Sequence, residues 1–141
     1  MTHRVAVYVI LRSADGRVLF MLRDGTGYRD GEYGLPSGKA EQGESLVGAA
    51  VREVREEIGL ELDPESLQLV HAGERAAPGA RWLDFFFTCD RWDGEPVNAE
   101  PHKCAGLAWL PPSSPGVIAY LAAVIARIDA GVAFSTHADD R

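Results

Sequence analysis

The chain has 141 residues and a net charge of −7, which results from 14 Lys and Arg against 21 Asp and Glu. This length favours one domain with a sizeable hydrophobic core, and the negative charge without a basic patch argues against a polymeric nucleic acid as partner. Cys89 and Cys104 form no CxxC pair, so we expect buried free thiols rather than a zinc or redox site. The apolar start of the chain reaches Arg12 too early for a membrane span, which predicts a soluble cytoplasmic protein without membrane contact.

Strand-forming residues dominate the first part of the chain. A β-branched and aromatic run, an Asp-Gly turn and a second apolar run predict a hairpin over residues 4–23. Residues 24–34 hold four glycines and no apolar periodicity, which predicts a mobile loop. Residues 35–38 are expected to lead from this loop into a helix that Gly59 ends.

The second half of the chain predicts more strands and a final helix. We expect strands over residues 67–73, 81–89 and 106–110, the first two joined around a Pro-Gly turn. From Pro115 onward, apolar residues recur at helical spacing, which predicts an amphipathic helix. Residues 135–141 are predicted to form a disordered tail. The sequence therefore predicts a single domain over residues 1–134, in which strands and two helices share one core as a mixed α/β layer fold (α+β).

The helix before Gly59 carries a cluster of like charges. At about 100° per residue, Glu53, Glu56 and Glu57 fall on one arc along the flank of its apolar side. Such charges repel one another, so either the cluster is a solvated helix face or a cation lies among the carboxylates. Arg52 is placed to reach back and orient a neighbouring carboxylate.

The cluster belongs to a longer pattern. Its defined positions are Gly38, Glu44, Arg52-Glu53-Val54, Glu56-Glu57 and Gly59-Leu60, within 23 consecutive residues. This pattern matches the Nudix box at every defined position, so the chain resembles a Nudix hydrolase. The resemblance implies the Nudix fold, a mixed β-sheet sandwiched between helices, and hydrolysis of a nucleoside diphosphate linked to another group.

The resemblance also implies roles for the box residues. In the family, glutamates matching Glu53, Glu56 and Glu57 bind Mg²⁺, for which Mn²⁺ can substitute, and the carbonyl of the residue matching Gly38 can join them. The residue matching Glu44 supports the loop or the helix start. We expect Glu53 to act as the general base, with Arg52 as an orienting residue.

Residues outside the box add candidates. The segment 98–109 is similar to the N-x-E-P-x-K stretch ending in Trp of MutT-like nucleoside triphosphate pyrophosphatases, which makes Glu100 a candidate ligand or base; the alternative is an ordinary loop acid. Arg23 and Lys39 are candidate substrate phosphate contacts, or else surface cations. Ser37 stands where the family usually has a second glycine, which affects loop geometry.

Aromatic residues offer rings for stacking on a base. The candidates are Trp82, Phe85, Phe86 and Phe87. Strand alternation sends some of these rings into the core, so at most one or two should meet a nucleobase. His71 has no metal-ligand spacing and is expected to be structural.

The main functional hypothesis is Mg²⁺-dependent hydrolysis of a small (deoxy)nucleoside triphosphate to monophosphate and pyrophosphate. Alternatives are an ADP-ribose, nucleotide-sugar or dinucleotide pyrophosphatase, and a non-catalytic nucleotide-sensing module, which the intact box disfavours. An isoprenoid diphosphate isomerase is disfavoured because no cysteine lies in the box region. A homodimer is compatible with the sequence but does not follow from it.

Overall fold

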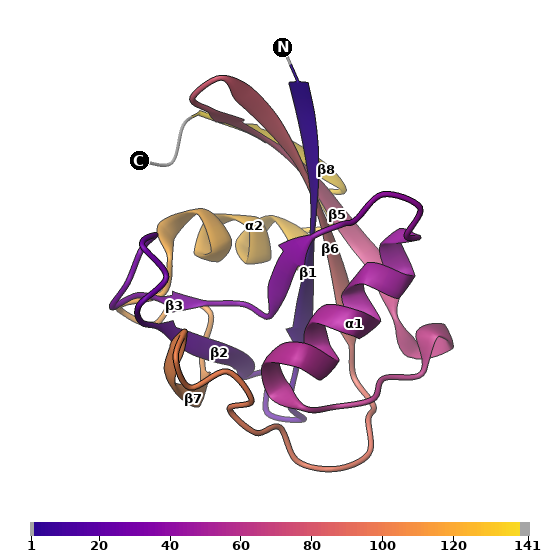
Figure 1. The fold of residues 1–141 in the computed structure, drawn as a ribbon, viewed down its shortest axis with the longest axis vertical. Helices are drawn as coiled ribbons and strands as arrows, with labels where there is room; N and C mark the ends of the chain where they lie inside the picture. The colour runs from indigo at the N-terminus through magenta and orange to yellow at the C-terminus, as the bar shows by residue number, and fades with distance from the viewer. Residues whose placement is uncertain (1, 139–141) are drawn as a thin grey trace.

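The computed structural model describes residues 2–138 as a set of strands and helices around one core (Figure 1). The strands are β1 (Thr2–Leu11), β2 (Val18–Arg23), β3 (Tyr33–Gly34), β4 (Ser37–Lys39), β5 (Gln68–Ala77), β6 (Ala80–Cys89), β7 (Cys104–Leu110) and β8 (Phe134–His137). The helices are α1 (Leu46–Ile58) and α2 (Ala119–Asp129), and a short 3₁₀ turn η1 (Pro64–Ser66) follows α1.

The strands form a larger sheet of order β4-β1-β6-β5-β8 and a smaller one of order β3-β2-β7. In the larger sheet β1 runs parallel to β6 and antiparallel to β4, so the sheet is mixed. One side of β1, including Val7, packs with Val54 of α1, while Ile10 packs with Leu121 of α2 on the other side. The two helices therefore cover opposite faces (Figure 1), which confirms the predicted mixed sheet between helices.

The boundaries of α1 follow from its capping residues. The Ser45 side chain accepts a hydrogen bond from the Gly48 N–H at 2.9 Å, and Gly59 ends the helix in the left-handed conformation with φ 72°. The end at Gly59 confirms the prediction, but the expected start directly after Gly38 is wrong. Gly38 lies in β4, where it pairs with Val7, because this segment completes the sheet before the helix begins.

The predicted hairpin over residues 4–23 is also wrong in its pairing. The turn is present, with the Ser13 N–H bonded to the Arg17 carbonyl at 2.8 Å, but β1 and β2 belong to different sheets. β1 pairs with β4 and β6, and β2 pairs with β3 and β7. The second half of β1 and most of β2 are buried on both faces, so each strand lies inside a sheet and is paired there with segments other than its neighbour in sequence.

The predicted disordered tail is wrong for residues 135–137. β8 runs parallel to β5 at the edge of the larger sheet, so the domain extends past residue 134. Buried His71 bonds through Nδ1 to the Val132 carbonyl at 2.8 Å and through Nε2 to Ser135 Oγ at 2.7 Å. His71 is therefore structural, as expected. The end of the predicted tail, residues 139–141, lies outside the described residues.

Both cysteines, Cys89 and Cys104, are buried free thiols, as predicted. Over the described residues 2–138, no helix combines the length and the apolar character needed to cross a bilayer.

The contact between β8 and His71 is testable by one substitution. Ser135→Ala leaves the buried His71 Nε2 without its Ser135 partner, so we expect the free energy of unfolding to fall by about 1–3 kcal/mol. Thr136→Ala, on the exposed side of the same strand, should stay within about 0.5 kcal/mol of wild type. Urea denaturation measures both, and equal stabilities for the two variants would contradict an ordered β8.

Candidate active site

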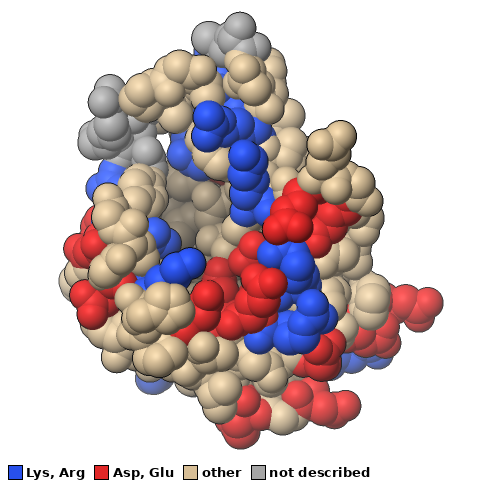
Figure 2. Space-filling view, viewed as in Figure 1, with Lys and Arg blue, Asp and Glu red and all other residues tan. Residues whose placement is uncertain are grey.

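A cleft of about 530 Å³ opens beside α1, and charged residues dominate its lining. We call it the acidic cleft; its charged residues are Arg23, Glu41, Arg52, Glu53, Glu56, Glu57, Glu100 and Lys103. Figure 2 shows acidic and basic side chains gathered side by side next to a hollow on this face. Among the predicted site residues, the cleft brings together the three α1 glutamates, Gly38, Arg52, Glu100 and Arg23. Glu44 and Lys39 lie outside its lining.

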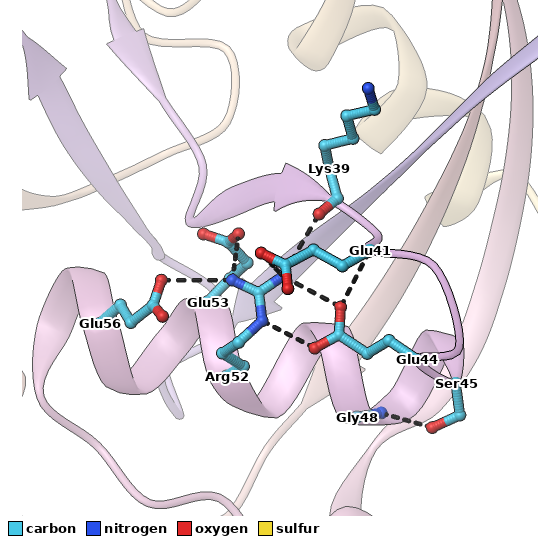
Figure 3. A network of polar contacts seen from close by, with 8 residues as sticks. All are labelled: Lys39, Glu41, Glu44, Ser45, Gly48, Arg52, Glu53 and Glu56. Carbon is cyan, nitrogen blue, oxygen red and sulfur yellow. Dashed lines mark hydrogen bonds and ion pairs between the residues drawn. The ribbon is translucent and has the colours of Figure 1, made fainter.

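Arg52 is the centre of an ion-pair network in this cleft (Figure 3). Its Nε and Nη2 donate to the two Glu44 carboxylate oxygens at 2.7 and 3.0 Å. Its Nη1 donates to Glu53 at 2.9 Å and to Glu56 at 3.2 Å. The bidentate hydrogen bond from Arg52 lowers the pKa of Glu44 to about 2. Arg52 thus contacts the carboxylates of Glu44, Glu53 and Glu56, and its role as an orienting residue stays a prediction.

Glu57 is the most perturbed acid of the site. Burial, followed by the charge of Glu53, raises the pKa of Glu57 to about 9, while a hydrogen bond from the Ser37 N–H at 3.1 Å opposes this rise. Burial also raises the pKa of Glu53, and Arg52 opposes that rise. Without a cation, the hydrogen-bonded carboxyl groups of Glu53 and Glu57 therefore keep a proton between them near neutral pH.

Glu100 reaches the acidic cleft because its loop is fastened to the end of α1. The Ala99 N–H donates to the Glu57 carbonyl at 3.1 Å, and Asn98 Nδ2 donates to the Cys104 carbonyl at 2.7 Å. The charge of Glu100 contributes to the raised pKa of Glu57, although less than burial and Glu53 do. The loop thus adds a carboxylate to the α1 glutamates from outside the helix.

The donor set of the cleft suits a hard divalent cation. Carboxylate oxygens are the ligands that Mg²⁺ prefers, and a Cβ at position 38 would overlap the Glu53 carboxylate, so the glycine leaves the backbone open beside it. Within residues 2–138, no three acidic, imidazole or thiol groups already converge on one point. Glu53 and Glu56 instead pair with Arg52, so a bound cation would compete with this guanidinium.

Arg23 lies where the acidic cleft meets a second hollow. Its Nε donates to the Tyr28 carbonyl at 2.7 Å and its Nη2 to Thr26 Oγ1 at 3.0 Å, so the side chain organises the loop that was expected to be mobile. The predicted partner cation, Lys39, points its ammonium away from the carboxylates (Figure 3). It lines the second hollow instead.

This second hollow has a volume of about 430 Å³ and shares Arg23, Ser37 and Gly38 with the acidic cleft. We call it the aromatic cleft; the residues that define it are Tyr8, Arg23, Tyr28, Lys39, Arg75 and Trp82. Of the four aromatic candidates on β6, Trp82 lines it, whereas Phe86 and Phe87 are buried in the core. Phe85 packs against the core cluster beneath α1.

The sequence reasoning missed several lining residues. Lys103 lines the acidic cleft and is the Lys of the N-x-E-P-x-K segment, so that segment contained a signal for it. Glu41 also lines the cleft and lies 3.9 Å from Arg52. Tyr8, Tyr28 and Arg75 of the aromatic cleft come from separate elements, and no local pattern connects them.

The raised pKa of Glu57 predicts a pH-dependent stability. Between its unfolded value of 4.5 and about 9, the metal-free folded protein holds a proton that the unfolded chain has lost, so stability falls as the pH rises. We expect a loss on the order of 1–3 kcal/mol from pH 5 to pH 8 in EDTA, which Glu57→Gln removes. Urea denaturation at several pH values measures this. The exposed Glu95→Gln should keep the wild-type slope, and parallel profiles for wild type and Glu57→Gln would contradict the assignment.

Comparison with solved structures supports the fold. A MutT Nudix hydrolase from Burkholderia pseudomallei superposes with a TM-score of 0.72 at 28% identity, covering 81% of this chain and 87% of that one. A MutT protein from Methanosarcina mazei gives a TM-score of 0.78 over 92% of this chain and 94% of its own, and at 19% identity it shows the fold alone.

Sequence comparison identifies the family. The 8-oxo-dGTP diphosphatase of Escherichia coli is 30% identical over 119 residues, which are 79% of this chain and 91% of that protein. The human 8-oxo-dGDP phosphatase NUDT18 is 37% identical over 86 residues, which are 60% of this chain and 25% of that protein. A family model described as a NUDIX domain matches residues 2–129. Together with the Escherichia coli relative, this match shows that the chain belongs to the Nudix hydrolase family.

Proposed function

We propose that this protein hydrolyses (deoxy)nucleoside triphosphates to the monophosphate and pyrophosphate with Mg²⁺. The observation that carries the proposal is the junction of the two clefts at Arg23, Ser37 and Gly38. A cleft rich in carboxylates, suited to a cation and phosphates, opens directly into one lined by aromatic rings. A nucleotide likewise joins a phosphate group, which suits the first cleft, to an aromatic base, which suits the second.

The relatives support a purine substrate. The Escherichia coli relative is an 8-oxo-dGTP diphosphatase by name, and the chain spans most of its length. We therefore propose purine deoxynucleoside triphosphates, 8-oxo-dGTP among them, as the substrates to test first.

In this proposal, Glu53, Glu56, Glu57 and Glu100, with the carbonyl of Gly38, would hold Mg²⁺. When bound, the cation neutralises the charge on phosphate oxygens that otherwise repels an attacking water.

The remaining roles belong to side chains of the chain itself. Glu53 accepts the proton of the water, and Arg52 fixes the direction of its carboxylate through the 2.9 Å contact. Glu44 holds Arg52 in place. Arg23 and Lys103, which line the acidic cleft, steady phosphate groups, and Lys39 meets the part of the nucleotide that enters the aromatic cleft.

The products test the reaction. We expect 8-oxo-dGTP and dGTP to yield monophosphate and pyrophosphate with Mg²⁺, and EDTA to abolish turnover, as followed by product-resolved chromatography. Release of inorganic phosphate from the terminal position would contradict the proposal. Cleavage of ADP-ribose without turnover of triphosphates would assign the protein to the nucleotide-sugar or dinucleotide class, and tight binding without hydrolysis would indicate a sensor.

The carboxylates can be tested one at a time. Glu53→Gln, Glu56→Gln and Glu57→Gln should each lower kcat by about 10² or more, roughly 3 kcal/mol on the transition-state scale. Glu100→Gln should also lower kcat strongly with little change in KM, because its contact is proposed to matter in the transition state. The exposed Glu95→Gln serves as the matched control. Wild-type turnover in Glu100→Gln would show that Glu100 takes no part in the reaction.

A further inference from the structure

The aromatic cleft has a charge opposite to that of the acidic cleft. Arg23, Lys39 and Arg75 line it, and no Asp or Glu of the described chain does. The chain as a whole carries a net charge of −7, so this cleft is lined by positive side chains on a protein that is negative overall. A ligand group in this cleft meets positively charged hydrogen-bond donors.

Arg75 is held in the wall of this cleft by a buried carboxylate. Its Nε donates to Asp84 Oδ2 at 2.9 Å and its Nη2 to Oδ1 at 3.4 Å, and the Tyr120 hydroxyl donates to the same Oδ2 at 2.6 Å. Asp84 is 0% exposed and Arg75 is 9% exposed. A buried pair of this kind is weak evidence for stability, because desolvation opposes the attraction of the charges. A recognition role gives a reason for its presence.

The neighbouring rings fix the guanidinium further. Trp82 pairs in register with Arg4 on one side and with Arg75 on the other. The guanidinium carbons of Arg4 and Arg75 lie 5.8 and 5.4 Å from the Trp82 ring centroid, and that of Arg75 lies 5.5 Å from the Tyr120 ring. Of the two arginines that flank Trp82, Arg75 lines the cleft and exposed Arg4 does not.

The chemistry of a guanidinium decides which base it accepts. Arg offers donors and no acceptor, so it pairs with ring nitrogen and carbonyl acceptors and leaves an amino group unpaired. A hydrogen bond from Arg to O6 is part of the commonest specific protein contact to guanine. We propose that Arg75 is a specificity-determining residue, which selects purines that carry an oxygen at C6, such as guanine and hypoxanthine, over adenine, which carries an amino group there. This inference rests on the proposed function, because it takes the aromatic cleft as the base site.

The test compares substrates that differ at C6. The specificity constant kcat/KM is measured for dITP and dATP with Mg²⁺ in wild type, in the double variant Arg75→Gln/Asp84→Asn and in Arg4→Gln. The double variant removes both charges, so that no buried carboxylate is left unpaired, and thermal denaturation confirms that it folds. Arg4→Gln is the matched control, since Arg4 contacts the same ring from outside the cleft. Titration of tryptophan fluorescence with dGMP and dAMP reports binding without hydrolysis.

We expect wild type and Arg4→Gln to prefer dITP by about tenfold, and the double variant to lose most of this preference. A folded double variant that keeps the preference, or an equal loss in Arg4→Gln, would overturn the role of Arg75. Hydrolysis by wild type without discrimination at C6 would overturn it as well and leave the proposed function intact. Arg75-dependent preference for dGMP over dAMP without any hydrolysis would support the role of Arg75 and refute the hydrolysis.

Discussion

The guanidinium of Arg52 organises the carboxylates on which the site depends. It contacts Glu44, Glu53 and Glu56, and its Nη2 also donates to the Lys39 carbonyl at 3.3 Å. One side chain therefore connects α1, the loop before α1 and the end of β4. Carboxylates at helical spacing repel one another, and Arg52 offsets part of this repulsion while it fixes their directions. The remaining repulsion is relieved at Glu57, whose raised pKa keeps a proton in the site when no cation is present.

Under the proposed function, the two clefts would divide the recognition of a nucleotide by charge. The carboxylates of the acidic cleft repel phosphates unless a cation neutralises their charge. The aromatic cleft is lined by cations of the protein itself, so it attracts electron-rich groups without a bound metal ion. Arg23 lines both clefts, and its hydrogen bonds to Thr26 and Tyr28 hold the intervening loop. On this view, the cation determines whether the phosphates bind and the wall of the aromatic cleft determines which base binds. In this proposal, the carboxylates around Arg52 serve the first selection and Arg75 serves the second, while Arg23 borders both clefts.

Local patterns were sufficient to predict part of this structure. The arc of Glu53, Glu56 and Glu57 and the end of α1 at Gly59 follow from helical periodicity and capping, which act over a few residues. Pairings between distant segments were not predictable in this way. The contact of His71 with Ser135 joins residues 64 positions apart, so residues 135–137 resembled a free tail. The buried network around Arg75 likewise draws on separate strands and a helix, and alternation alone does not reveal it.

The parallel pairing of β1 with β6 has a consequence for how the chain acquires its structure during synthesis. β1 occupies an inner position of the larger sheet, but its neighbour β6 is made only after more than half of the chain. β4 pairs with β1 and places Gly38 beside the Glu53 carboxylate. This wall of the acidic cleft therefore forms only when β1 is in its place in the sheet. Long-range pairings of this kind form slowly, because closing a long loop costs conformational entropy before the stabilising contacts between the strands are made. We therefore infer that the ordered cleft appears only after β6 has emerged from the ribosome.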